Sequence, residues 1–141
     1  MGYGKAGSFE GFCSGGGIAR LGEMLKSQAK EKGIATELEA IDVLTAKNIS
    51  DAAKNGDTVA KDVYRICAEK LGAGLSIIID ILNPEIIIIG SIYQRDTEMF
   101  EDIINEIINK EALSHSAKVC KVVPAELGNS IGDFAALGLV F

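Results

Sequence analysis

The chain has 141 residues, of which 48% are hydrophobic, and a formal net charge of −6. This length suits one domain with a substantial core, and the apolar content argues against disorder. The negative charge and scattered lysines argue against a nucleic-acid-binding surface, and no apolar run approaches the roughly 20 residues that cross a bilayer. We therefore expect a single domain over residues 1–141, in the cytoplasm, without direct contact to nucleic acid or membrane.

The glycine-rich N-terminus predicts close backbone packing and turns with positive φ. A helix opens at Ser8-Phe9-Glu10, and its apolar positions predict that it continues past Ser14 towards Lys32. Gly33 then ends it, because glycine adopts the left-handed conformation that closes helices.

Residues 36–44 are expected to be irregular or extended, and residues 49–54 to form a short helix that ends at Asn55-Gly56. Asp57 then caps a long helix that runs to Leu82, with apolar residues at the spacing of one buried stripe. Gly72 and Gly74 lie inside this helix and lower its intrinsic stability. We expect them to allow close approach by a neighbouring helix or by a ligand.

Four consecutive isoleucines, Ile86 to Ile89, predict a strand at the centre of a sheet with both faces covered, since a strand with one wet face would alternate apolar with polar residues. The strand ends at Gly90-Ser91. In open α/β sheets, ligands collect where strands end. We therefore expect part of any binding site there, although a core strand with an ordinary turn would leave the same pattern.

After this strand we expect a polar loop over residues 93–96 and a helix capped by Asp96 or Thr97, with an apolar stripe from Met99 to Ile108. Residues 118–123 predict a second strand, which Pro124 stops, and residues 131–139 a final helix. A sheet of two strands is marginal by itself. Either the N-terminus adds edge strands, or another chain or domain covers the sheet.

No self-contained catalytic centre is evident. His115 is the one histidine, and we expect it in a solvated loop. Cys13, Cys67 and Cys120 are odd in number and far apart, which predicts free thiols. Glu10 stands out as a carboxylate at a glycine-rich helix start, where it would either accept hydrogen bonds from sugar hydroxyls or only favour the helix dipole.

Four motifs carry a family resemblance. They are Gly4-x-x-Gly7-Ser8-x-Glu10-x-x-x-Ser14-Gly15, Ala53-Lys54-Asn55-Gly56-Asp57-x-x-Ala60, Leu82-Asn83-Pro84-Glu85 with the four isoleucines and Gly90, and Leu127-Gly128-x-x-x-Gly132-x-x-Ala135-Ala136. In this order, over essentially the whole chain, they resemble the C-terminal half of the ROK family of repressors, open reading frames and sugar kinases. The resemblance implies an α/β, ribonuclease-H-like (actin-like ATPase) C-terminal lobe, helix-rich with a small sheet.

The resemblance also implies a binding site. Glu10 corresponds to a glutamate that binds sugar hydroxyls, so a hexose or N-acetylhexosamine is the implied substrate. Gly15, Gly16 and Gly17, together with Gly90 and Ser91, correspond to segments that border ATP, which acts with Mg²⁺ in the complete protein. Ser91 stands where the family has a second glycine.

Zinc is not implied for this chain. The cysteines that hold a structural zinc in the family fall on Met1, Tyr3 and Ser8, whose side chains do not supply thiolate ligands. We therefore predict that no zinc is bound.

The family's phosphate loop and catalytic aspartate do not occur in these residues, so we assign no catalytic residue and do not expect sugar phosphorylation by this chain alone. The leading hypothesis is the C-terminal domain of an ATP-dependent, glucokinase-like sugar kinase that works with an N-terminal lobe. The alternatives are the sugar-sensing domain of a transcriptional repressor, or a degenerate module that forms a homodimer and has no catalytic role.

Overall fold

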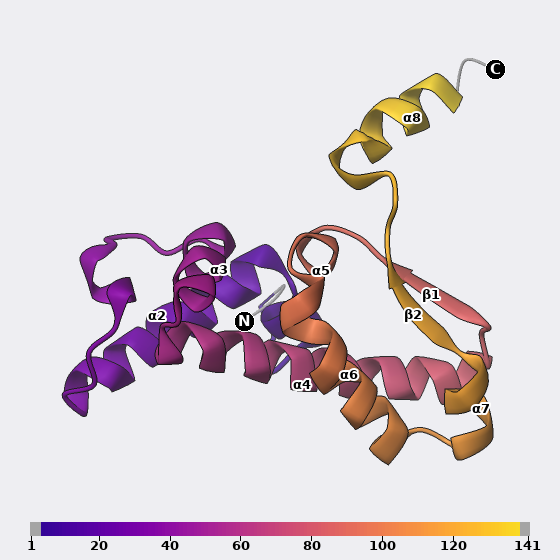
Figure 1. Cartoon of the computed structure of the whole chain (residues 1–141), viewed down its shortest axis with the longest axis horizontal. Coiled ribbons are helices and arrows are strands. Elements are labelled where there is room, and N and C mark those ends of the chain that lie inside the picture. The colour runs from indigo at the N-terminus through magenta and orange to yellow at the C-terminus, as the bar shows by residue number, and fades with distance from the viewer. Residues whose placement is uncertain (1–3, 139–141) are drawn as a thin grey trace.

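The long helix α4 (Thr58–Leu82) is the element around which the chain folds (Figure 1). The structure, a computed structural model, describes the backbone of residues 4–138 and the side chains of all of these except residues 129, 131 and 133. The other elements are α1 (Phe9–Cys13), α2 (Gly15–Glu31), η1 (Glu37–Ala40), α3 (Ala46–Asn55), β1 (Ile86–Ile89), α5 (Ile92–Arg95), α6 (Thr97–Glu111), α7 (Ser114–Val119), β2 (Lys121–Pro124), η2 (Gly128–Ser130) and α8 (Ile131–Gly138).

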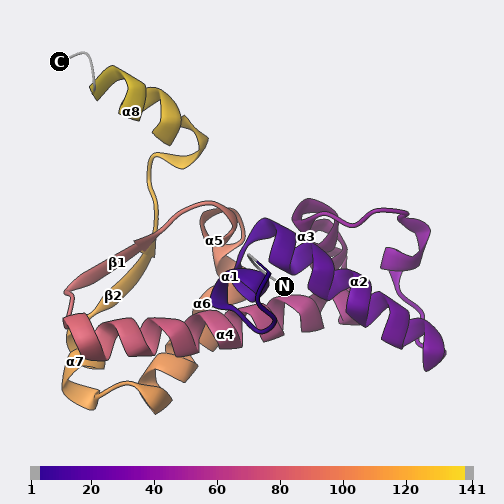
Figure 2. The ribbon, with the colours of Figure 1, turned by 180° about the vertical axis from the view of Figure 1, so that it is seen from behind.

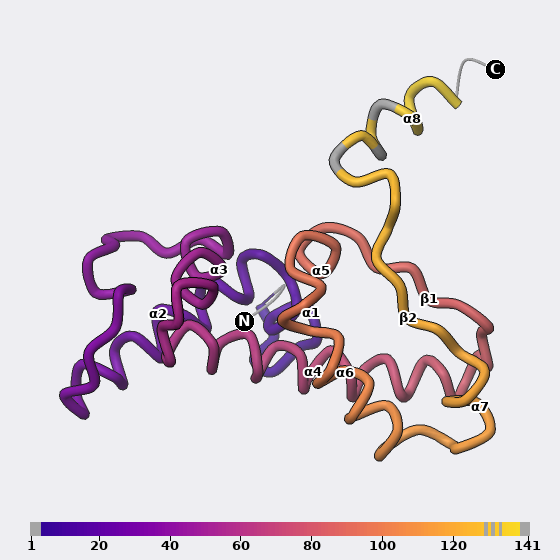
Figure 3. The backbone as a smooth tube through the Cα atoms, in the orientation of Figure 1, coloured from indigo at the N-terminus to yellow at the C-terminus, as the bar shows by residue number. Residues whose placement is uncertain are grey.

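Helices α2, α3, α6 and α7 all pack on α4. Helix α6 runs along α4 from Tyr64, which contacts Phe100, to Gly72, which faces Ile107. Figure 2 shows α1 from behind, lying against the middle of α4. The core forms where these helices meet, with Ile18, Ile49, Val63, Phe100 and Ile104 buried. Helix α8 extends away from this body (Figure 3).

Several helix ends follow the local sequence signals. The Asp57 carboxylate accepts a hydrogen bond from the Ala60 amide at 2.8 Å, which confirms it as the cap of α4. Gly33 and Gly56 close the preceding helices with φ of +66° and +107°. The short helix of residues 49–54 is longer than predicted, because Thr45 and Asn48 form a capping box that starts it at Ala46.

The continuous helix predicted across Ser14 is wrong. Ser14 has an extended backbone, with φ of −87° and ψ of 164°, and its hydroxyl accepts a hydrogen bond from the Gly17 amide at 3.0 Å. Serine is a strong helix cap because its hydroxyl satisfies an amide left free in the first turn. The chain therefore turns at Ser14, and α1 and α2 are separate helices.

The predicted sheet centre is also wrong for the residues described. β1 and β2 are the only strands between residues 4 and 138, and residues 4–8 add none to their sheet. Ile87 and Ile89 pack on the core, whereas Ile86 and Ile88 are 52% and 63% exposed. One face of the isoleucine strand is open because no other element within residues 4–138 covers it.

Three predictions downstream need correction. Residues 92–95 form the helical turn α5 rather than a polar loop, because Tyr93 is buried against the Phe100 ring and Asp96 is buried and hydrogen-bonded to Ser50 and Tyr64. The second strand begins at Lys121 and includes Pro124, while residues 114–119 form α7. His115 is therefore an exposed helical residue.

Gly72 and Gly74 confirm the prediction of close helix approach. A methyl group added to Gly72 would lie 2.8 Å from Ile107 Cβ on α6, and one added to Gly74 would overlap the Phe9 ring of α1. The predicted stripe on α6 is confirmed by its buried members Phe100, Ile104 and Ile108. The predicted last helix is present as α8, and its residue 139 lies outside the described residues.

Candidate functional site

The carboxyl ends of β1 and β2 meet at one edge of the sheet. The strands are parallel, with Ile86 opposite Lys121 and Ile89 opposite Pro124. The next residues stay close, since a methyl group added to Gly90 would lie 3.8 Å from the Ala125 Cβ. This edge is where ligands bind in open parallel sheets.

Ser91 has a backbone conformation that glycine prefers. Its φ of 58° and ψ of −120° are unusual for a residue with a side chain, and it introduces α5 without a capping hydrogen bond. The turn after β1 therefore requires a glycine-like backbone, which fits a position where a ligand approaches the main chain.

We predict that Ser91→Gly raises the free energy of unfolding by about 1 kcal/mol, because glycine adopts this conformation without steric cost. Urea denaturation measures the change. Ser27→Gly is the matched control, since Ser27 is exposed within α2 and glycine should lower stability there by about 0.5 kcal/mol. A loss of stability at both positions would contradict the strain assigned to Ser91.

The glycine run at the start of α2 adjoins this edge. A methyl group added to Gly15 would lie 3.3 Å from Ile92 Cδ1, one residue beyond Ser91. Gly17 is buried, and a methyl group there would lie 2.6 Å from the Gly11 carbonyl oxygen. Gly16 is exposed and has only the flexible end of Arg20 nearby, at 3.2 Å. Of the three glycines, Gly16 leaves its backbone most accessible.

Glu10 lies on α1, beside the glycine run. The Ser8 hydroxyl accepts a hydrogen bond from the Gly11 amide at 3.2 Å and so fixes the start of this helix. Glu10 is half-buried, and its carbonyl oxygen would lie 2.9 Å from a methyl group added to Gly17. The fold therefore places the backbone of Glu10 against α2, whose first residue contacts the segment after Gly90-Ser91.

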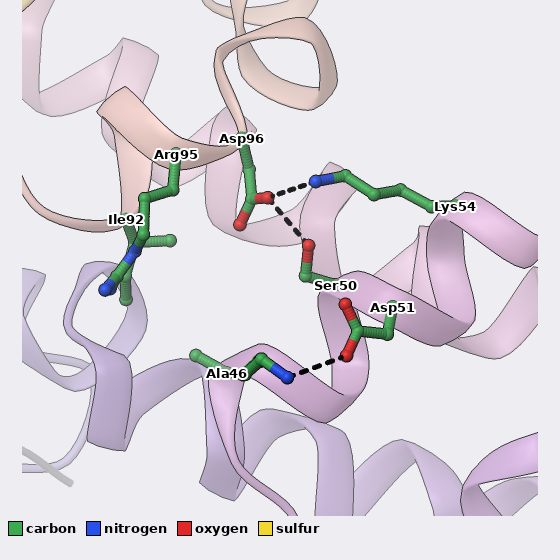
Figure 4. A pocket seen from close by; sticks show the side chains of 8 residues that line it. Ala46, Ser50, Asp51, Lys54, Ile92, Arg95 and Asp96 are labelled. Carbon is green, nitrogen blue, oxygen red and sulfur yellow. Dashed lines mark hydrogen bonds and ion pairs between the residues drawn. The ribbon is translucent and has the colours of Figure 1, made fainter.

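A hollow of about 330 Å³ separates α3 from α5 (Figure 4). It is lined by Ala46, Lys47, Ser50, Asp51, Lys54, Ile92, Arg95 and Asp96. Lys47 pairs with Asp51 at 3.5 Å, and Lys54 pairs with Asp96 at 2.8 Å. Sequence reasoning missed this hollow, because its two walls come from segments about 40 residues apart in the chain.

Asp96 joins the walls of the hollow to the core. Its carboxylate accepts hydrogen bonds from the Ser50 hydroxyl at 2.7 Å, from the Lys54 ammonium at 2.8 Å and from the Tyr64 hydroxyl at 2.7 Å. Asp96 occupies the N-cap position of α6, as predicted, but makes no capping hydrogen bond. Its side chain instead ties α5 to α3 and α4.

The electrostatics of this group are consistent with a charged Asp96. Burial acts to raise the pKa of Asp96, but the hydrogen bonds from Lys54, Ser50 and Tyr64 outweigh it and hold the pKa below its ordinary value. The bond to Asp96 raises the pKa of Lys54. Burial, followed by the bond to Asp96, raises the pKa of Tyr64. Tyr64 therefore stays neutral as a donor.

A sequence model of the ROK family matches residues 2–140 of the chain. The chain belongs to the ROK family. A glucokinase of Halalkalibacterium halodurans is 32% identical over 129 residues, which cover 92% of this chain and 39% of that protein. A xylose repressor of Caldicellulosiruptor bescii is 31% identical over 109 residues, which cover 77% of this chain and 27% of the repressor.

Solved structures of ROK proteins have the same fold. A ROK family glucokinase from Streptomyces griseus, in complex with glucose and AMPPNP, superposes with a TM-score of 0.78 at 27% identity, over 96% of this chain and 45% of that one. A ROK family transcriptional regulator homologous to Escherichia coli MLC superposes with a TM-score of 0.74 at 26% identity, over 88% of this chain and 30% of the regulator. These neighbours support the predicted actin-like lobe, and the chain spans less than half the length of each of these relatives.

The predicted absence of zinc remains a prediction. Met1 and Tyr3 lie outside the described residues, and the Ser8 hydroxyl serves as the cap of α1. Within residues 4–138, as far as their side chains are described, no three His, Cys, Asp or Glu residues are grouped to hold a metal ion. In the same part of the chain, no helix combines the length and apolar character needed to cross a membrane.

Proposed function

We propose that this chain is the nucleotide-binding lobe of an ATP-dependent sugar kinase of the ROK family. The observation that carries the proposal is the convergence of Gly15, Ile92 and the Gly90-Ser91 turn at the carboxyl edge of β1, with the hollow between α3 and α5 beside them. The accessible main chain at the carboxyl end of β1 suits a ribose. The partly apolar hollow beside it suits a nucleobase.

ATP with Mg²⁺ would supply the phosphoryl group and neutralise its charge. In this proposal Gly90 and Ser91 lie against the ribose, while the exposed backbone of Gly16, in the first turn of α2, faces the phosphates. Ile92 gives the hollow an apolar wall, and Arg95 gives it a positive charge, whereas the charge of Lys54 is paired with Asp96. The AMPPNP bound by the Streptomyces griseus glucokinase supports this choice of ligand.

Glu10 would orient the sugar by accepting hydrogen bonds from two hydroxyl groups of a hexose or N-acetylhexosamine. The base that receives the sugar proton, and the loop that holds the phosphate, must come from outside these residues. On the open face of the sheet, a hollow of about 660 Å³ is lined by apolar residues that include Ile86, Ile88 and Leu127, all three of them exposed. This exposed apolar surface supports the proposal that an N-terminal lobe or a second copy of the chain covers it.

Repressors among the relatives favour a second candidate, a sugar-sensing domain in a transcriptional regulator. Both functions would use Glu10, but only the kinase needs the Gly90-Ser91 turn for a nucleotide. We propose no nucleic-acid contact from these residues, since the net charge is −6. Binding of sugar without any binding of ATP would favour the regulator.

Calorimetric titration with ATP·Mg²⁺, glucose and N-acetylglucosamine tests the proposal. We predict that Glu10→Gln weakens sugar binding about tenfold, because an amide accepts weaker hydrogen bonds than a carboxylate, and leaves ATP binding unchanged. Glu31→Gln, at the exposed end of α2, is the control and should alter neither. Equal sugar affinity in the Glu10→Gln variant and the unmodified chain would remove Glu10 from the site.

A further inference from the structure

Two of the three cysteines come together where α1 meets α4. Cys13 is the last residue of α1, and Cys67 lies within α4 with 1% of its surface exposed. The Cys67 thiol donates a hydrogen bond to the Phe12 carbonyl oxygen at 3.2 Å. Phe12 is bonded directly to Cys13, so the Cys67 sulfur lies beside the peptide group that leads into Cys13. Cys120 follows α7 and stands outside this pair.

The two thiols have unequal surroundings. Cys13 is half-buried, so small reagents reach it, whereas Cys67 is enclosed by the core. Interaction with the neighbouring Cys67 thiol lowers the pKa of Cys13 despite partial burial, and interaction with Cys13 together with burial raises the pKa of Cys67. Cys13 is therefore the thiol that ionises and attacks, with Cys67 beside it as the second thiol.

We propose that Cys13 and Cys67 are an oxidation site at which hydrogen peroxide forms a disulfide between α1 and α4. The Cys13 thiolate attacks one peroxide oxygen and breaks the O–O bond, which leaves a sulfenic acid on Cys13 and, after protonation, one water. The Cys67 sulfur then attacks the Cys13 sulfur, and the sulfenic oxygen leaves as a second water. Two thiols are oxidised and one peroxide is reduced.

The bond would act on the helix that carries Glu10. α1 has five residues, none of them fully buried, and it is held in place by packing against α2 and α4. A covalent link to the long helix removes much of the freedom of α1 to open. Oxidation should therefore slow amide hydrogen exchange in residues 9–14. This inference concerns the thiols alone and does not depend on the proposed kinase function.

Peroxide treatment followed by peptide mapping without reduction tests the proposal. We expect a peptide pair linked through Cys13 and Cys67, a mass loss of two hydrogens, and one remaining free thiol. Cys120→Ser should give the same link, whereas Cys13→Ser should give no intramolecular link. A disulfide through Cys120, or overoxidation of Cys13 without any link, would overturn the proposal.

A second measurement needs no change at the buried cysteine. Phenylarsine oxide bridges two thiols that lie within reach of each other, so the folded Cys120→Ser variant should bind one equivalent and lose both free thiols. Retention of both thiols after treatment of the folded variant would show that Cys13 and Cys67 do not meet in solution, and the proposed site would be wrong.

Discussion

Asp96→Ala is expected to lower the free energy of unfolding by about 3 kcal/mol, because it removes a buried acceptor that serves three donors. The hydroxyls of Ser50 and Tyr64 would lose their bonds to the carboxylate inside the core. Lys54 would lose its shorter ion pair, although its side chain is 45% exposed and water replaces part of that interaction. Urea denaturation measures the loss.

Glu98→Ala is the matched control for this prediction. Glu98 also pairs with Lys54, but at 3.6 Å and with 67% of its side chain exposed. Exposed ion pairs contribute little, so this change should cost less than about 0.5 kcal/mol. Similar losses in the two variants would mean that Asp96 acts only as a surface charge.

The contribution of Asp96 should also depend on pH. Because the pKa of Asp96 is lower in the folded chain than its ordinary value of 3.8, its charged form stabilises the fold above that pH. The stability is lost as pH falls through the folded-state pKa. The difference in unfolding free energy between the unmodified chain and Asp96→Asn should therefore be constant near neutral pH and shrink below about pH 4.

Gly17→Ala and Gly16→Ala should change stability in opposite directions. A methyl group on Gly17 would meet backbone atoms of Gly11 and Glu10 at 2.6–2.9 Å, and these atoms cannot rotate away. We expect a loss of about 2–3 kcal/mol as α1 separates from α2. At Gly16 the nearest atom belongs to the flexible Arg20 side chain, so alanine should stabilise α2 by about 0.5–1 kcal/mol.

The same pair of variants separates packing from ligand binding. Gly16→Ala should retain the fold but weaken ATP binding if the backbone of Gly16 faces the phosphates. Calorimetry on both variants, with circular dichroism to confirm folding, measures the two effects. A stabilised Gly16→Ala variant with unchanged ATP affinity would move the phosphates away from the start of α2.

Features set by a few neighbouring residues could be predicted from the sequence. Asp57 and Gly56 mark helix ends through their own side chain and backbone freedom, and both predictions are confirmed. The break at Ser14 could not be predicted in this way, because a serine is also tolerated inside a helix. It depends on α1 folding back onto Gly17, which is a tertiary contact.

The isoleucine strand shows a different limit. Its composition predicts burial on both faces, yet Ile86 and Ile88 are exposed in this chain. Apolar patterns reflect the surroundings of the whole protein, and this chain spans less than half the length of the relatives described above. The open face is therefore the surface on which we propose that an N-terminal lobe or a second copy packs.

The hydrogen bonds that Asp96 accepts from Ser50, Lys54 and Tyr64 are the part of the candidate site that sequence reasoning missed. Ser50 and Tyr64 lie 46 and 32 positions away from Asp96, so no local spacing links them. The one available signal was an aspartate directly before Thr97, which predicts a helix cap. The cap position is correct, but the side chain turns into the core because buried donors compete for it.

The most direct test of the account is an amide-resolved NMR titration of the chain with ATP·Mg²⁺. If ATP binds at the carboxyl edge of β1, the largest chemical-shift changes should fall on Gly16, Gly90, Ser91 and Arg95, while His115 on α7 stays unchanged. No shift at millimolar nucleotide, or shifts confined to α7 and α6, would contradict the proposal that this lobe binds ATP at that edge.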